Sequence, residues 1–152
     1  MTNVVETIKK QIDETVKNSI LKAVQNGELP EFTVEELIIE IPKEKGHGDF
    51  STNIAMQAAK TVRKAPRQVA EIIIKNMDIS KTYIERVEMA GPGFINFFLT
   101  NTWLYDVLKV IQKEKENYGR LDIGRGQKVM VEFVSANPTG PLHMGNARGG
   151  AL

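Results

Sequence analysis

The stretch TYIERVEMAGPGFINFFL, residues 82–99, decides the fold that we expect for most of this chain. It contains two runs rich in β-branched and aromatic residues, 82–91 and 93–99, joined around a Gly-Pro-Gly sequence. Runs of this composition that flank a glycine-containing turn are typical of antiparallel hairpins. We therefore predict two neighbouring strands, against which the remaining elements pack.

Apolar residues at steps of three and four predict helices on both sides of this hairpin. The first helix covers residues 3–26, a second has an alanine-lined face over 54–62, and a third begins at Pro66. A fourth, capped by Thr100 or Asn101, follows the hairpin. A β-branched run at 34–41 predicts a further strand.

The segment KEKGHGDFSTN, residues 43–53, is predicted to be a glycine-punctuated loop that leads into a helix. Asp49 and Ser51 are candidate caps because short polar side chains accept hydrogen bonds from the first N–H groups of a helix. His47 beside Asp49 also suggests a metal pair or an acid–base dyad. Two ligand types without further partners make a weak site. We interpret the segment as structural and expect no metal site.

Composition limits the classes of function. The 152 residues include no cysteine, which excludes disulfides, thiolate metal sites and a cysteine nucleophile. The formal net charge is +1, so any contact with nucleic acid depends on a local patch. The N-terminus is polar, and no apolar run approaches the ~20 residues of a membrane span. We expect a cytoplasmic protein with no membrane partner.

A charged stretch with three glycines, residues 113–127, precedes a near-continuous apolar run at 128–135. Such a run is typical of a strand buried on both faces of a parallel sheet. We predict an α+β domain at 1–120, with helices packed on a small antiparallel sheet. At 121–152 we predict a linker with the first strand and turn of a Rossmann-like α/β domain.

Polar groups follow the apolar run. Ser135, Asn137 and His143 precede Gly145 and a helix start, and a helix N-terminus next to a glycine suits a phosphate group. A histidine there can donate to an oxyanion that develops as phosphates separate. The tetrapeptide His-Met-Gly-Asn is short, however, and taken alone it is better explained by a histidine that satisfies local backbone.

The longer stretch VEFVSANPTGPLHMGNARGGAL, residues 131–152, closely resembles the signature of arginyl-tRNA synthetases around their HIGH motif. KEKGHGDFSTNIAMQAAK and GPGFINFFL resemble the extra N-terminal domain of the same family, in the expected order. The resemblance spans nearly the whole chain. It implies the N-terminal part of a class I enzyme, monomeric when complete, that uses ATP to attach arginine to tRNA-Arg through an arginyl-adenylate.

By position, the resemblance assigns ATP, with Mg²⁺, to the HIGH-like turn. His143, Gly145 and Asn146 are the implied ATP-binding residues, and His143 and Asn146 are the implied catalytic ones. Asn146 stands where the motif more usually has a second histidine. An asparagine can still donate a hydrogen bond to a phosphate, but it cannot carry a proton or a positive charge.

The resemblance also implies an arginine site and a tRNA site. Glu132 matches the carboxylate that faces the substrate guanidinium, and Ser135 and Asn137 match positions that hold the main-chain groups of the amino acid. Without the resemblance, Glu132 is more simply a surface carboxylate. Phe94 and Asn96 fall where the family contacts the D-loop of tRNA. Strand alternation places them on one face, although aromatic residues on a strand are usually core.

Two further expectations follow. A KMSKS-like second ATP clamp does not occur among the 152 residues, so we expect this chain to be catalytically inert alone. The run at 128–134 has no sheet neighbours in the sequence, and we expect it to pair with another copy or to be disordered. The alternatives are a stand-alone RNA-binding module and, ranked lower, another nucleotidylyltransferase that carries a HIGH motif.

Overall fold

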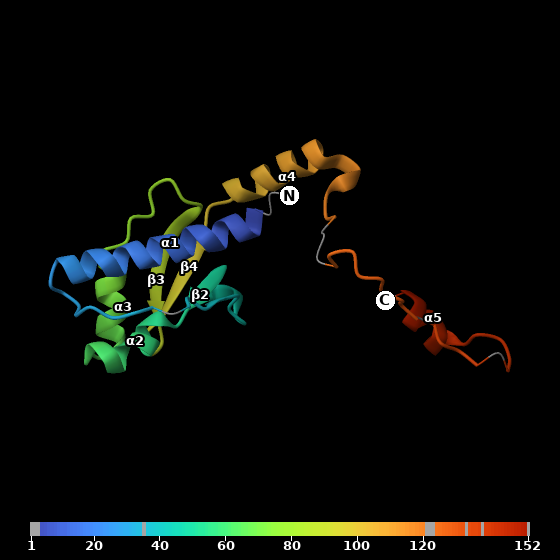
Figure 1. Ribbon diagram of the computed structural model, residues 1–152, viewed down its shortest axis with the longest axis horizontal. Helices are drawn as coiled ribbons and strands as arrows, with labels where there is room; N and C mark the ends of the chain where they lie inside the picture. Colours follow the sequence, from blue (N-terminus) through green and yellow to red (C-terminus); the bar gives the residue numbers. More distant parts are fainter. Residues whose placement is uncertain (1–3, 35, 121–123, 133, 138, 152) are drawn as a thin grey trace. The chain divides into compact units, whose positions relative to one another are not determined.

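The computed structural model describes residues 4–34, 36–120, 124–132, 134–137 and 139–151 (Figure 1). The chain divides into two compact units, Met1–Tyr118 and Gly119–Leu152. In the described part of the chain, no helix is both long enough and apolar enough to cross a membrane.

The first unit combines helices with a small antiparallel sheet, and the predicted α+β class is confirmed. Its helices are α1 (Val4–Gln25), α2 (Ile54–Val62), α3 (Pro66–Lys75) and α4 (Thr102–Glu114), with 3₁₀ turns η1 (Lys45–His47) and η2 (Lys115–Asn117). The strands are β1 (Ile39–Glu40), β2 (Phe50–Thr52), β3 (Ile84–Ala90) and β4 (Phe94–Leu99). They form a four-stranded sheet in the order β1-β2-β4-β3, and β3 and β4 form the predicted hairpin.

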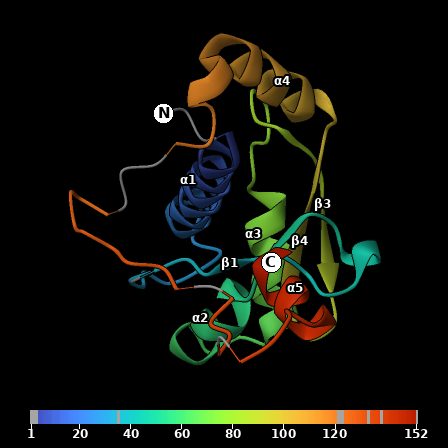
Figure 2. The ribbon, with the colours of Figure 1, turned by 90° about the vertical axis from the view of Figure 1, so that its right-hand side faces the viewer.

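One face of this sheet carries the hydrophobic core. Ile95, Phe97 and Leu99 of β4 point into it and are buried, together with Val69 and Ile73 of α3. Helix α3 contacts β3 and β4, and α1 contacts α3 in turn (Figure 2). The apolar stripe predicted for the first helix is buried along its length, as expected for an amphipathic helix that covers a core.

Residues 43–53 are not the simple loop that the sequence predicts, because β2 lies within them. The Asp49 N–H donates to the Phe97 carbonyl oxygen at 2.9 Å, and Asp49 Oδ2 accepts from the Leu99 N–H at 2.8 Å. Asp49 is therefore bound to β4 and does not cap a helix, and Ser51 is part of β2. Both cap predictions are wrong, because Asp49 is hydrogen-bonded to the backbone of β4 and Ser51 is paired with Asn96 in the sheet.

Two other predictions need correction. Of the strand expected at 34–41, only Ile39–Glu40 is a strand, and residue 35 lies outside the described residues. Residues 128–132, 134 and 135 form no strand, while residue 133 lies outside the described residues. A strand exists only when a second strand satisfies its backbone, and no described segment pairs with this run. An apolar run cannot by itself reveal whether that partner is present.

The segment just before β2 approaches β4 very closely at Gly48. A Cβ atom there would lie 2.7 Å from the Phe97 carbonyl oxygen, and the residue has φ +85° and ψ −169°. That backbone region is essentially restricted to glycine, and other residues held in it cost ~1–3 kcal/mol.

We predict that Gly48→Ala lowers the free energy of unfolding by at least about 2 kcal/mol, because strain and a backbone clash act together. Gly46→Ala is the matched control, since a Cβ at Gly46 would meet nothing within 4 Å. Urea unfolding followed by circular dichroism measures both. Equal stability of the two variants would contradict this account of Gly48.

Candidate nucleotide and RNA sites

The sheet face opposite the core carries a row of polar side chains, one from each strand. Glu40 pairs with Ser51, Ser51 with Asn96, and Asn96 with Glu88. Directly paired residues on neighbouring strands point to the same side of a sheet. The row therefore crosses the whole sheet, and Asn96 on β4 lies near its centre.

A cavity of about 670 Å³ lies over part of this row. Phe94, Asn96 and Ser51 come from the sheet, the segment 40–43 and His47 form one side, and the hairpin turn 90–92 forms another. Its volume falls within the ~300–1,000 Å³ typical of small-ligand sites. The structure thus brings Phe94 and Asn96 together, while their binding role stays a prediction.

Asn96 is more enclosed than the sequence suggests. Only 4% of it is exposed, although it lies on the sheet face opposite the core. None of the described residues hydrogen-bonds to its side-chain amide. Among the described residues, the buried side-chain atoms that lack a partner are Thr52 Oγ1 and Glu114 Oε2. The amide of Asn96 is not one of them, so it reaches the solvent of the cavity.

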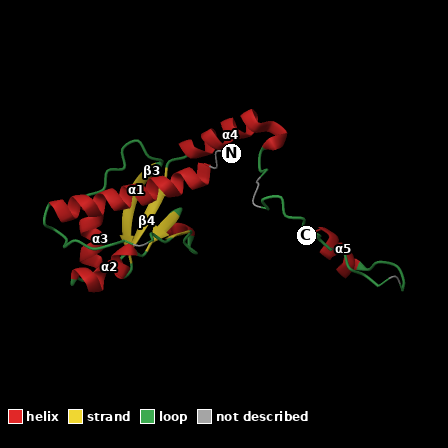
Figure 3. Ribbon diagram, viewed as in Figure 1, coloured by secondary structure: helices red, strands yellow, loops and turns green. Residues whose placement is uncertain are grey.

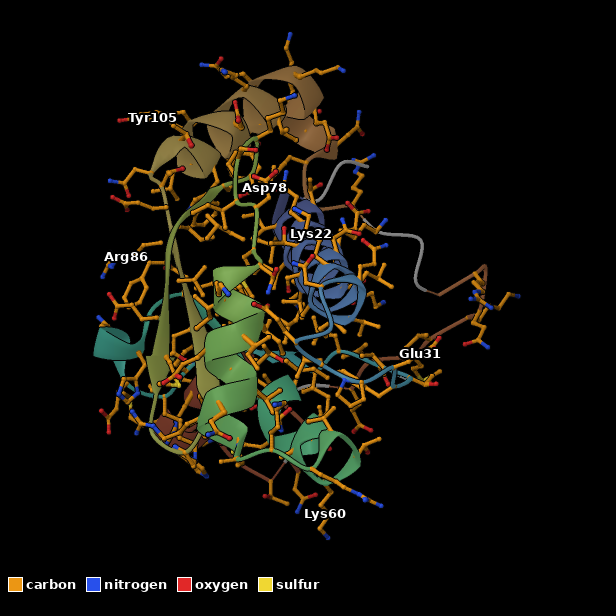
Figure 4. All side chains as sticks on the ribbon, turned by 90° about the vertical axis from the view of Figure 1, so that its left-hand side faces the viewer. Lys22, Glu31, Lys60, Asp78, Arg86 and Tyr105 are labelled. Atoms are coloured by element: carbon orange, nitrogen blue, oxygen red, sulfur yellow. The ribbon has the colours of Figure 1, made fainter. Side chains whose placement is uncertain are left out.

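The two aromatic side chains beside Asn96 differ in their availability. The Arg86 guanidinium lies 3.6 Å from the centre of the Phe98 ring, and Arg86 Nε donates to Glu88 Oε1 at 2.8 Å. Figure 4 shows Arg86 projecting from β3 on the side away from α3. Phe94 is 36% exposed and borders the cavity. A stacking ligand would therefore meet Phe94, because Arg86 covers Phe98.

The hairpin turn beside the cavity is anchored to helix α3. Arg67 Nη1 donates to the Gly91 carbonyl oxygen at 3.1 Å. At Gly93, where φ is +136°, an added Cβ would lie 3.0 Å from the Pro66 backbone. No local pattern could reveal the role of Arg67, because its partner lies 24 residues away.

A second group of polar residues lies in the other unit, before helix α5 (Met144–Ala151), the last helix in Figure 3. Ser135, Asn137, His143 and Asn146 line one cavity of about 380 Å³. Glu132 joins them indirectly, because Ser135 Oγ donates to Glu132 Oε1 at 2.6 Å. The residues implied for arginine and for ATP are therefore neighbours within this unit.

Helix α5 starts with a reciprocal pair of hydrogen bonds. The Gly145 N–H donates to His143 Nδ1 at 3.1 Å, and the His143 N–H donates to Asn146 Oδ1 at 3.1 Å. The bond to Asn146 matches one half of a capping box, while the His143 ring accepts from the second helical N–H and not from the third. Because Nδ1 accepts a hydrogen bond, the proton of the neutral ring lies on Nε2. His143 Nε2 and Asn146 Nδ2 are thus the donors that the cap leaves unused.

Among the described residues, no three His, Cys, Asp or Glu side chains gather closely enough to hold a metal ion. The residues 6–99 match the family described as the arginyl tRNA synthetase N-terminal domain. This chain belongs to that family. The match ends with β4, so α4 and the second unit lie outside it.

Relatives of this arginyl-tRNA synthetase N-terminal domain extend the comparison to the second unit. The chain is 92% identical over 152 residues to the arginine–tRNA ligase of Acetivibrio thermocellus and 64% identical to that of Ruminiclostridium cellulolyticum. Both matches cover 100% of this chain but 27% of the relative, so the chain spans about a quarter of their length.

A solved structure supports the fold. The crystal structure of the arginyl-tRNA synthetase from Plasmodium falciparum aligns with a TM-score of 0.52 and 23% sequence identity. The alignment covers 66% of this chain and 17% of the Plasmodium chain. At this identity, the likeness shows the fold alone.

The unpartnered amide of Asn96 leads to a prediction about stability. We expect Asn96→Leu to raise the free energy of unfolding by at most about 1 kcal/mol, because the variant removes a mostly enclosed amide that makes no hydrogen bond with the described residues. Asn18→Leu, at an exposed position of α1, is the control. Urea unfolding measures both, and a loss of stability in Asn96→Leu would show that the amide stabilises the fold.

Proposed function

We propose that this chain acts within an arginine–tRNA ligase, and that its first unit contacts tRNA-Arg through the cavity over Asn96. The observation that carries the proposal is the enclosed amide of Asn96, which has no partner among the described residues and lies beside an exposed aromatic ring. Its amide atoms are not fully buried, so a ligand in the cavity can reach them. In a binding site, a ligand supplies the hydrogen-bond partner that such an amide lacks.

A base from a single-stranded RNA loop fits this combination of groups. An asparagine amide both donates and accepts, so it can pair with the edge of a base. An aromatic face stacks on a base with ~1–3 kcal/mol. Unstacked bases of loops are the usual targets of sequence-specific RNA recognition, which agrees with a contact to the D-loop of tRNA.

For the second unit we propose the arginine contacts that the resemblance implies. Glu132 would pair with the substrate guanidinium, because a carboxylate binds that planar group through two parallel hydrogen bonds. The hydrogen bond from Ser135 to Glu132 holds the carboxylate at the edge of the cavity. Ser135 and Asn137 line the cavity and would contact the main-chain groups of arginine.

The ATP contacts that we propose lie at the start of α5. His143 Nε2 and Asn146 Nδ2 would donate to the phosphates and stabilise the charge that develops as pyrophosphate leaves. The Gly145 N–H is taken up by His143, so Gly145 contributes by allowing close approach of the nucleotide. Mg²⁺ would arrive bound to the phosphates of ATP and neutralise part of their charge.

The complete ligase would act in the cytoplasm as a monomer. In this chain Val129, Met130 and Val131 are at least 72% exposed, which supports self-association through this run. A stand-alone RNA-binding module is the alternative, and the joining of this chain to the remaining part of a relative, described below, separates it from the ligase.

The first experiment tests the tRNA contact. We expect the 152-residue chain to bind a tRNA-Arg transcript, and Asn96→Ala to weaken binding about tenfold or more, as lost contacts to one base imply. Asn18→Ala is the control. Filter binding measures both variants, and unchanged affinity of Asn96→Ala would refute the cavity as the contact.

The second experiment tests whether the chain activates arginine. We expect no arginine-dependent exchange of pyrophosphate into ATP, because the sequence carries no KMSKS-like second clamp on the phosphates. Measurable exchange above a His143→Ala control would contradict this expectation. Strong tRNA binding without exchange fits both the ligase part and the stand-alone module. Restored exchange on joining the chain to the remaining part of a close relative favours the ligase.

A further inference from the structure

The rim of the cavity over Asn96 carries charges of both signs. Glu40 lies at the sheet end of the rim, in the row with Ser51 and Asn96. Lys43 and His47 lie farther along the same segment. His47 Nε2 is 3.8 Å from Glu44 Oε2, whereas Lys43 forms no ion pair with any described residue. Lys43 is therefore the cation of this rim that no carboxylate neutralises.

The segment that carries Lys43 is held at both ends. On one side it follows β1, which pairs with β2 through Ile39 and Glu40. On the other side the His47 N–H donates to the Glu44 carbonyl oxygen at 3.0 Å, and Asp49 is bonded to Phe97. The backbone around Lys43 is thereby placed beside the cavity before any ligand arrives.

This arrangement gives a bound nucleotide one orientation. A phosphate would be repelled by Glu40 and attracted by Lys43, while a base amino group would find an acceptor in Glu40. We propose that Lys43 binds the phosphate of the nucleotide whose base enters the cavity over Asn96, and that Glu40 faces the base edge. The inference rests on the proposed tRNA contact and adds the side chain that holds the RNA backbone.

The salt dependence of binding tests the proposal. Each phosphate contact adds about 0.7 to 0.9 to the slope of log affinity against log salt concentration. We expect Lys43→Gln to lower the slope by that amount and to weaken binding of a tRNA-Arg transcript roughly 8- to 15-fold at 50 mM salt, with the difference vanishing towards 1 M. Asn96→Ala should weaken binding at every salt concentration without changing the slope.

Two variants control for other causes. Lys43→Arg keeps the charge and should keep the slope, and Lys113→Gln in the last turn of α4 should change neither slope nor affinity. Thermal unfolding of each variant checks that it is folded. If Lys43→Gln keeps the wild-type slope while Asn96→Ala still loses binding, the phosphate contact is wrong and the proposed function stands. If the wild-type chain does not bind, or Asn96→Ala binds normally, both proposals are overturned.

Discussion

The close approach of β2 to β4 is the constraint on which the sheet depends. At Gly48 the two backbones lie so near that no side chain fits, and the next residue, Asp49, is bonded to β4 through both its N–H and its carboxylate. This contact places β4 between β2 and β3, with Phe97 in the core and Asn96 on the opposite face. The close approach at Gly48 therefore belongs to the same register of β2 and β4 that leaves Asn96 lining the cavity.

The two faces of β4 differ in what they contribute to stability. Ile95, Phe97 and Leu99 bury apolar surface against the helices, which drives folding. Asn96 contributes little to that stability, because its amide faces the cavity and makes no hydrogen bond with the described residues. The binding role that we propose for this residue rests on the cavity and the exposed aromatic ring beside it.

Local periodicity was enough to predict most of the helices and the hairpin. The stripe of the first helix and the alternation of the hairpin are short-range patterns, and both are found in the structure. The prediction failed where a distant partner decides the outcome. Asp49 reads as a helix cap but is bonded to Leu99, fifty positions away. The run at 128–135 reads as a buried strand, although a strand also needs a neighbour.

In the candidate sites, too, some residues could be predicted from local sequence and others depend on distant contacts. Alternation on one strand and the family resemblance were enough to select Phe94 and Asn96 together. Lys43 lines the cavity because of the path of a loop, and Arg67 is bonded to the turn that borders it. No local spacing encodes either arrangement. The capping bonds between His143, Gly145 and Asn146 were equally hidden, because they depend on where the helix begins.

The anchoring of the hairpin turn by Arg67 has an entropic consequence. The turn and the segment before β2 are both fastened to the folded core, so neither has to be ordered when a nucleotide enters. Ordering a mobile side chain on binding costs ~0.5–1.5 kcal/mol, and a preorganised site avoids much of this loss. The binding that we propose for this sheet face therefore uses a preformed site and does not require a loop to fold around the ligand.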